Sequence, residues 1–243
     1  LLKNFERQNI CRLLSEKKIC IGINFGKSKK TPLEEAKEDY LYSMKLLLPY
    51  CKYAVINVSS PNTEGLRRLQ DPELLKELLR EIKILSNCPP LFVKIAPDLT
   101  FQEIDEICQL ISDEKIDGII ATNTSLDRVG LEDRVILESG LKLSMEKGGL
   151  SGKPIQSKAN KILKHIYDLD KEIVLIGVGG IDSPKAAWER ICSGASLIQI
   201  YTGWIYKGPK LVPDILNGIL NQLNLHGITN IKEAVGSGLD WKE

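Results

Sequence analysis

The sequence predicts an α/β fold, a (β/α)8 TIM barrel built as a single domain over residues 1–243. Apolar runs of strand length alternate with amphipathic segments of helix length, an order that gives parallel strands joined by right-handed crossovers. Nearly every strand carries its polar residues or glycines only at its end, as expected where all loops converge on one mouth of a barrel. A doubly wound sheet would instead concentrate such residues at one switch point.

Six strands are predicted where a closed barrel has eight. They occupy residues 19–23, 54–56, 91–95, 118–121, 173–176 and 196–201. If the last two form the closing pair of the barrel, its two opening units lie outside these residues, which begin without a methionine. We therefore expect about six of the eight βα units here, with an amphipathic helix over residues 1–16 in front of them.

The predicted helices begin at recognisable capping residues. Thr31 is expected to cap a helix over about 33–48, with Pro32 in its first position and Glu34 completing a capping box. Three more helices start at similar pairs: Asp71 with Pro72, Thr100 with Glu103, and Ser183 with Pro184. The helix after Asp71 is expected to bury one apolar face: Leu74, Leu75, Leu78, Leu79 and Ile82. Helices at 157–169 and about 209–223 complete the alternation.

The composition argues against several classes of protein. Lys and Arg number 33 against 32 Asp and Glu, so no bulk charge attracts nucleic acid. No apolar run approaches the roughly 18 residues of a membrane span. Six cysteines without a CxxC pair predict reduced thiols in an intracellular protein. His165 and His226 lie in helix-like segments far from polar clusters, so we expect no metal site and no catalytic triad.

The most informative stretch runs from Tyr53 to Thr63, where an apolar strand changes abruptly into a polar loop. Five small hydrogen-bonding side chains surround Pro61: Asn57, Ser59, Ser60, Asn62 and Thr63. Amides and hydroxyls bind a polar planar ligand without fixed charge, and a serine among them can take part in chemistry. The segment alone fits a structural βα turn with Asx and serine caps equally well.

Three glycine-rich turns indicate a phosphate-bearing ligand. GVGG at 177–180 and the Thr202-Gly203 turn follow the last two strands, where barrels frequently bind phosphate. GGLSG at 148–152 adds a third flexible segment with the hydroxyl of Ser151. Backbone N–H groups without a neighbouring Cβ can approach an anion closely. GVGG lacks the GxGxxG spacing of a dinucleotide-binding fold.

Lys94 is the one charge inside an apolar strand, in VKIAP. It could neutralise a buried acid, form a Schiff base as in barrel aldolases, or stabilise negative charge on a reduced cofactor. These residues alone do not choose among the three. Between Leu126 and Gly149 lies a polar connection longer than a standard βα loop, which we interpret as a candidate lid.

Taken together, the motifs resemble the class 2 dihydroorotate dehydrogenases, flavin enzymes that make the pyrimidine precursor orotate and pass electrons to a membrane quinone. The matching segments follow the family's order: INVSSPNTEGLRRLQ, VKIAPDL, GIIATNTSLDR, KGGLSGKP, IGVGGI and GASLIQIYTG. The resemblance runs from about Gly22 to Gly236. Class 1 relatives carry a cysteine where this chain has Ser60, so the SSPN form and INFGKSK at 23–29 are similar to class 2.

The resemblance implies a role for each residue of the predicted site. Ser60 would be the catalytic base that removes a proton from dihydroorotate while the adjacent carbon gives hydride to FMN, and Thr63 would assist in a proton relay. Orotate would contact Asn57, Asn62, Asn123 and Thr124. Ten residues would bind FMN, the last six of them at its phosphate end: Asn24, Asn57, Lys94, Thr122, Ser151, Gly152, Gly179, Gly180, Tyr201 and Thr202.

The resemblance also sets expectations for partners and location. Family members carry an earlier segment that docks on the membrane and forms the quinone tunnel, together with the first barrel strands, and we expect both to be absent from this chain. The enzyme would then work at the cytoplasmic face of a bacterial inner membrane or, alternatively, at the mitochondrial inner membrane. Three other interpretations remain: another FMN-dependent barrel oxidoreductase (class 1 or dihydropyrimidine dehydrogenase-like), a Schiff-base lyase using Lys94, and a barrel without cofactor.

Overall fold

A computed structural model describes residues 20–131, 133–137 and 139–243. In these residues six parallel strands form one sheet whose strand order follows the chain. The strands are β1 (Gly22–Phe25), β2 (Tyr53–Asn57), β3 (Leu91–Ile95), β4 (Gly118–Ala121), β5 (Val174–Val178) and β6 (Leu197–Gln199). The helix predicted at 1–16 and the start of the first predicted strand, Ile19, lie outside the described residues.

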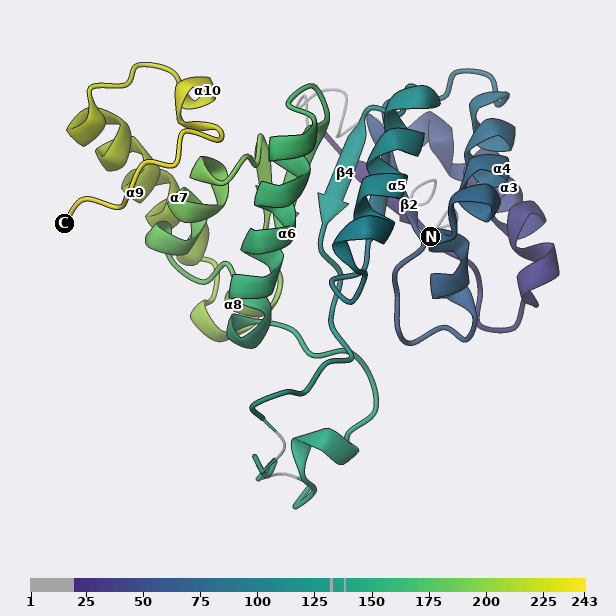
Figure 1. Cartoon of the computed structure of the whole chain (residues 1–243), viewed down its shortest axis with the longest axis horizontal. Helices are drawn as coiled ribbons and strands as arrows, with labels where there is room; N and C mark the ends of the chain where they lie inside the picture. Colours follow the sequence, from purple (N-terminus) through teal and green to yellow (C-terminus); the bar gives the residue numbers. More distant parts are fainter. Residues whose placement is uncertain (1–19, 132, 138) are drawn as a thin grey trace.

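Neighbouring helices lie side by side along the sheet (Figure 1). The α-helices are α3 (Ala36–Leu47), α4 (Pro72–Lys83), α5 (Phe101–Asp113), α6 (Gln156–Leu169), α7 (Pro184–Cys192), α8 (Thr202–Lys207), α9 (Leu211–His226) and α10 (Ile231–Ala234). Short 3-10 turns cover Leu33–Glu35, Leu48–Tyr50, Leu66–Gln70, Leu143–Met145 and Lys153–Ile155. Within the described ranges, none of the helices combines the length and apolarity needed to cross a bilayer.

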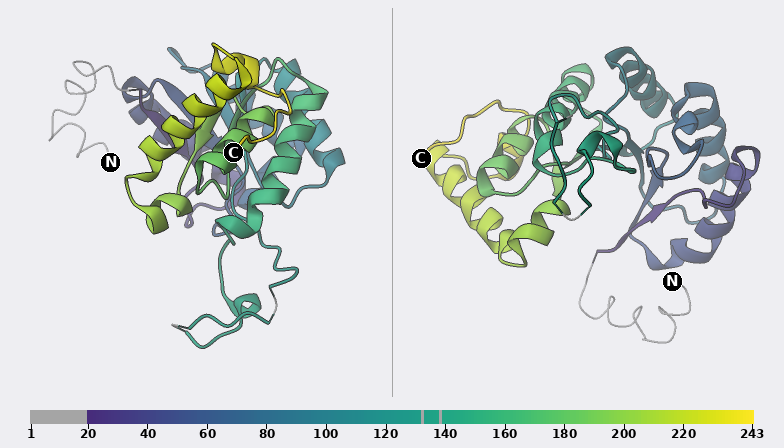
Figure 2. Two further views of the ribbon diagram at one scale, coloured as in Figure 1. Left: turned by 90° about the vertical axis from the view of Figure 1, so that its left-hand side faces the viewer. Right: turned by 90° about the horizontal axis from the view of Figure 1, so that it is seen from below.

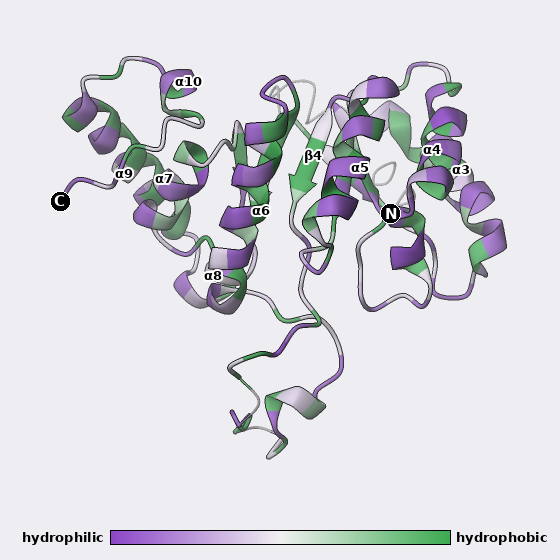
Figure 3. Cartoon of the chain, viewed as in Figure 1, coloured by the Kyte–Doolittle hydropathy of each residue, from purple (hydrophilic) through white to green (hydrophobic). Residues whose placement is uncertain are grey.

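The two faces of the sheet bury different sets of side chains, because successive residues of a strand point to opposite sides. Residues such as Ile56 and Val93 pack against the helices in the main core. On the other face, four residues from four adjacent strands form a separate inner cluster: Val55, Phe92, Ile120 and Ile176. In Figure 3 the helices carry both hydrophilic and hydrophobic colours, while β4 is hydrophobic along most of its length.

These features identify part of an α/β barrel. The strand order has no reversal in the described residues, and a doubly wound sheet would need one. Seen from below in Figure 2, the helices lie in an arc around the strands, as in a barrel wall. The six predicted strands are therefore confirmed, although their ends differ. β1 is shifted to Gly22–Phe25, so that Asn24 lies within the strand and not after it, β5 extends to Val178, and β6 is limited to Leu197–Gln199.

Three of the four predicted helix starts are confirmed. The side chains of Asp71 and Ser183 each accept hydrogen bonds from backbone amides of the helix that follows. Thr100 and Glu103 form a reciprocal capping box. The predicted apolar face of α4 is correct except for Leu74, which is 38% exposed while Leu75, Leu78, Leu79 and Ile82 are buried. Leu74 lies at the solvent edge of that face.

The prediction that Thr31 caps a helix is wrong. The residues after it form a 3-10 turn that starts from Pro32 without a side-chain cap, and α3 begins only at Ala36. The carbonyl of Thr31 instead accepts a hydrogen bond of 2.6 Å from Nζ of Lys27. Lys27 is buried, so its ammonium group must find protein acceptors, and this contact holds Thr31 in the loop rather than at a helix start.

Candidate functional site

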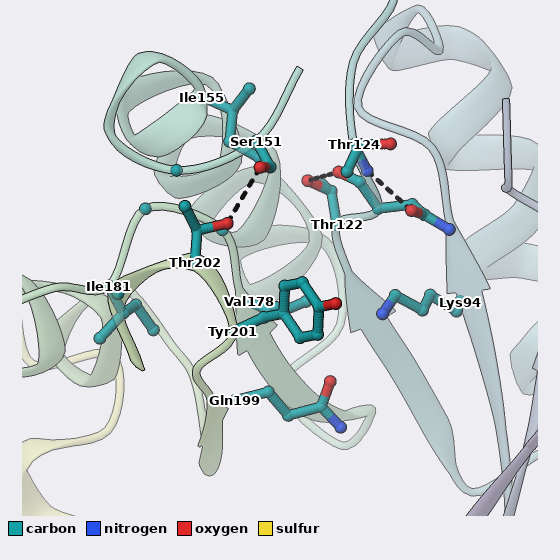
Figure 4. Close-up of a pocket in the computed structure, with 15 residues that line it drawn as sticks. Lys94, Thr122, Thr124, Ser151, Ile155, Val178, Ile181, Gln199, Tyr201 and Thr202 are labelled. Carbon is teal, nitrogen blue, oxygen red and sulfur yellow. Dashed lines mark hydrogen bonds between the residues drawn. The ribbon is translucent and has the colours of Figure 1, made fainter. Parts of the chain in front are cut away.

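The carboxyl ends of β3 to β6 surround a cavity of about 220 Å³ (Figure 4). Ten residues of the predicted site line this cavity: Lys94, Thr122, Asn123, Thr124, Ser151, Gly152, Gly179, Gly180, Tyr201 and Thr202. Lys94 lies in β3, and the others lie in the segments after β4, β5 and β6, positions up to 108 residues apart in the numbering of the chain (from Lys94 to Thr202). The fold therefore brings together most of what the sequence predicted as one site.

One end of the cavity is built from glycine backbone and two hydroxyl groups. Oγ1 of Thr202 donates to Oγ of Ser151 at 2.9 Å, the pair drawn with a dashed line in Figure 4. Gly180 has a φ of +74°, and a Cβ there would lie 2.5 Å from Cβ of Gln156. Only glycine fits such a position. Thr202 and Gly203 are not a free turn as predicted, because α8 begins at Thr202.

Behind these glycines lies a fully buried arginine. Arg190 of α7 donates to the carbonyls of Val178 and Gly179 at 2.9 and 2.7 Å, and its Nε donates to Asn160. All three acceptors are neutral, and burial lowers the pKa of Arg190 to about 10. The cavity end therefore has a positive charge directly behind the backbone that faces the cavity.

Lys94 reaches into the same cavity from the middle of the sheet. The pairing register places it beside Asn57 on β2 and Ile120 on β4. Burial lowers the pKa of Lys94, and no neighbouring acid in the described part of the chain offsets that effect. The prediction that Lys94 neutralises a buried acid is therefore not supported, and its other two interpretations stay open.

A cluster of uncharged polar groups lies beside Lys94, at the ends of β2 and β4. Nδ2 of Asn123 donates to Oδ1 of Asn57 at 3.1 Å and to Oγ of Ser59 at 3.0 Å. Oγ of Ser59 also donates to Oδ1 of Asn57 at 3.0 Å, and the backbone amide of Thr124 donates to Oδ1 of Asn123 at 2.8 Å. These mutual bonds fix the orientation of both amides.

The other predicted residues lie outside the cavity lining. Oγ of Ser60 accepts a bond of 3.3 Å from the backbone amide of Asn62, and both residues belong to the loop after β2. Thr63 follows in the same loop, with its carbonyl bonded to the amide of Leu66. Asn24 is exposed on β1, opposite Val55 in the pairing register. Ser60, Asn62 and Thr63 thus belong to the loop that follows Asn57 and Ser59, and Asn24 lies on β1, which pairs with β2.

The long connection predicted as a lid is tied at its base and projects from the rest of the molecule (Figure 1). Ser125 and Leu150 form an antiparallel bridge that joins its two ends. Gly149 packs so closely on Thr124 that a Cβ would overlap the Thr124 hydroxyl. A second cavity of about 520 Å³ lies between this segment and α8. The base of the connection therefore borders the site, while its function as a lid stays a prediction.

One polar residue of the site was not predicted, and one residue outside the site has a partner that was not predicted. Gln199 lines the cavity, and it carried the same signal as Lys94, a polar residue inside an apolar strand. His165 is not isolated as expected, because its Nε2 lies 2.6 Å from Oδ1 of Asp105. The sequence did not reveal that pair, since the two residues lie on different helices. Across the described residues, no three His, Cys, Asp or Glu side chains group as metal ligands do.

Fold and site together define a class of protein: an α/β barrel with glycine backbone, a partly buried lysine and uncharged amides around one cavity. Within that class, the chain belongs to the dihydroorotate dehydrogenase family. The family model described as Dihydroorotate dehydrogenase matches residues 4–223, which include every predicted site residue.

Relatives in sequence and in structure agree with this assignment. The chain is 54% identical to a dihydroorotate dehydrogenase (quinone) of Prochlorococcus marinus, over 91% of this chain and 57% of that protein. It is 50% identical to one of Nostoc punctiforme, over 96% and 64%. The crystal structure of a ligand-free DHODH from Eimeria tenella superposes with a TM-score of 0.79 at 34% identity, over 90% of this chain and 64% of that one. The chain thus spans about three fifths of the length of these relatives.

Proposed function

We propose that this chain is an FMN-binding barrel domain of a quinone-dependent dihydroorotate dehydrogenase, which oxidises dihydroorotate to orotate in de novo pyrimidine synthesis. One observation carries the proposal: the amide cluster of Asn57 and Asn123 lies beside a cavity that contains Lys94 and ends in a glycine cradle. An uncharged polar cluster, a lysine and a glycine-built segment around one cavity suit a planar substrate beside a flavin and its phosphate.

The residues of the cavity fit FMN. The exposed backbone at Gly179 and Gly180, with the hydroxyls of Ser151 and Thr202, would hold the phosphate. The charge of Arg190 behind that backbone favours a dianion there. Lys94, Thr122 and Asn57 would hold the flavin ring. When bound, FMN supplies the acceptor for the hydride that leaves dihydroorotate.

The chain's own residues would orient the substrate and remove its proton. Asn57, Asn62, Asn123 and Thr124 would bind the pyrimidine carbonyls and N–H groups with uncharged donors and acceptors. Ser60 would take the proton at its Oγ and pass it on through Thr63 and water, because a serine alone is a poor base. Lys94, desolvated and without an acid partner, would stabilise negative charge near the ring.

The partners and the location of the enzyme follow from the same proposal. Its second substrate would be a membrane quinone, as in the names of the relatives from Prochlorococcus and Nostoc. The protein would be peripheral to a membrane, at the cytoplasmic face of a bacterial inner membrane. No residue of the described site is assigned to the quinone.

The test is anaerobic and optical. Dihydroorotate is added to the purified flavoprotein, and bleaching of the flavin absorbance band is followed by stopped flow. We expect rapid bleaching that slows at least about 100-fold in Ser60→Ala. The exposed Ser86→Ala is the matched control and should leave the rate unchanged. A yellow protein that dihydroorotate does not bleach would overturn the substrate assignment.

Lys94 favours one second candidate function, a lyase that forms a Schiff base. Its partial burial lowers the pKa of the amine, which activates a lysine as a nucleophile. Borohydride reduction in the presence of a carbonyl substrate would then fix a covalent adduct on Lys94, visible by mass spectrometry. No adduct is expected if the dehydrogenase proposal is correct.

A further inference from the structure

Arg67, in the 3-10 turn Leu66–Gln70, connects two loops of the candidate site. Its Nε donates to the carbonyl of Ser59 at 3.0 Å, and one terminal nitrogen donates to the carbonyl of Thr124 at 2.8 Å. The other terminal nitrogen donates to Oδ2 of Asp98 at 2.8 Å. One planar guanidinium group therefore joins the loops after β2, β3 and β4.

Asp98 extends this connection on the other side. Its carboxylate accepts hydrogen bonds from the amide of Leu126 at 2.8 Å, from the hydroxyl of Ser125, and from Nζ of Lys158 on α6 at 3.1 Å. Partial burial alone would raise the pKa of Asp98, but the bonds from Ser125, Leu126, Arg67 and Lys158 outweigh it and lower the pKa to about 2. The carboxylate is thus ionised throughout the neutral range.

We propose that Arg67 and Asp98 are positioning residues that hold the Ser59–Ser60 loop at a fixed distance from the Asn123–Thr124 loop. Arg67 binds the carbonyl directly before Ser60 and the carbonyl of Thr124 with two donors of one rigid group. Neither Arg67 nor Asp98 lines the cavity, so they act through the loops and not on the ligand. This inference rests on the proposed function, since it assigns the base to Ser60.

The geometry matters more here than the charge of the pair. Both side chains keep about a fifth of their surface exposed, 21% for Arg67 and 22% for Asp98, and exposed ion pairs contribute little to stability. A lysine at position 67 would preserve the charge but not the fork of donors that reaches Ser59, Thr124 and Asp98 together. Since a misplacement of about 1 Å can slow catalysis about 100-fold, losing the fork should affect the reaction more than the fold.

The test uses the flavin-loaded enzyme in the same stopped-flow assay. For Arg67→Ala and Arg67→Lys, we expect the rate of flavin reduction at saturating dihydroorotate to fall on the order of 10- to 100-fold. Flavin content should stay unchanged. Millimolar guanidinium chloride should partly restore Arg67→Ala, and sodium chloride should not. Asp98→Asn should slow the reaction, and the double variant with Arg67→Ala should be no slower than Arg67→Ala alone.

The neighbouring Arg68→Ala is the matched control, because Arg68 is an exposed arginine in the same turn. It should reduce flavin at the unaltered rate and show no response to guanidinium. An unaltered rate in both Arg67 variants and in Asp98→Asn would overturn the inference, and so would a loss of rate explained wholly by lost flavin. Failure of the proposed function would show separately, as absence of bleaching in the unaltered enzyme.

Discussion

The two halves of the site are held in place by different kinds of structure. At the ends of β2 and β4, side chains hold one another: Asn57, Ser59 and Asn123 form a closed set of hydrogen bonds. At the ends of β5 and β6, the backbone conformation shapes the cavity: Gly179 and Gly180 have positive φ, and the short helix α8 begins at Thr202. An uncharged planar ligand needs oriented donors and acceptors, whereas a phosphate needs several N–H groups close together.

The arginine that supports each half shows the same contrast. Arg67 is partly exposed, pairs with Asp98 and spans three loops. Arg190 is fully buried and donates only to neutral oxygens. The first arginine connects loops, while the second supports one loop from behind and places a positive charge beneath it without an acidic hydrogen-bond partner. The two halves should therefore respond differently to substitution.

The largest effect is expected for Arg190→Met. Methionine fills much of the space but removes the donor to the carbonyl of Gly179 and to Oδ1 of Asn160, while the carbonyl of Val178 keeps its bond from the amide of Thr122. Buried unsatisfied groups of this kind lower the free energy of unfolding by about 3 kcal/mol in total. Urea denaturation measures this loss, with Arg80→Met as the control, because that arginine is exposed and paired with Glu114. A loss below about 1 kcal/mol would contradict the support assigned to Arg190.

Next comes Gly180→Ala, which tests the backbone cradle. The new Cβ would meet Gln156 at 2.5 to 2.8 Å, so the loop must move and flavin content should fall by more than half. Gly208→Ala is the control that separates backbone strain from the steric contact of the new Cβ. Gly208 has a similar φ of +70°, but no atom lies within 4 Å of an added Cβ. Flavin content and Tm measure both variants. Equal flavin loss in the two would argue against a steric role for the Gly180 position.

Asn123→Asp tests the side-chain half. A carboxylate oxygen would replace the Nδ2 donor that now faces Oδ1 of Asn57 and Oγ of Ser59, and the added charge repels an anionic ligand. Orotate should bind about 10- to 100-fold more weakly, or about 1.4 to 2.8 kcal/mol, while flavin content changes little. Spectral titration with orotate measures this, with the exposed Asn217→Asp as control. Unchanged orotate affinity would remove Asn123 from the substrate site.

The smallest effect is expected for Lys94→Met in the flavin-free protein. Burial lowers the pKa of Lys94 below its ordinary 10.5, so the folded state binds this proton less tightly than the unfolded chain and is destabilised while the amine is charged. Methionine should raise the free energy of unfolding by about 1 kcal/mol at pH 7. This gain should shrink as the pH rises toward 10.5. Lys52→Met, at an exposed lysine, should show no gain at any pH.

The sequence predicted the alternation of strands and helices and most of the cavity lining, because these depend on local patterns and strand ends. It did not predict the roles of Arg67 and Asp98, which lie 31 residues apart, or the contact between Arg67 and Thr124, 57 residues apart. Nothing in the run GLRRLQ distinguishes Arg67 from Arg68, although one joins three loops and the other is exposed. Thr31 shows the opposite error. The local pattern of Thr31, Pro32 and Glu34 predicted a helix start, but the carbonyl of Thr31 accepts a hydrogen bond from the buried Lys27 and the helix begins later.

The sheet order has a consequence for how the site is assembled. Because each strand of the described residues pairs with its neighbours in the chain, β2, β3 and β4 can pair during synthesis, while later residues are still in the ribosome. Residues 53–126 contain the whole amide cluster together with Arg67 and Asp98. The nascent chain can thus complete the amide cluster before Gly179 and Gly180 have left the ribosome.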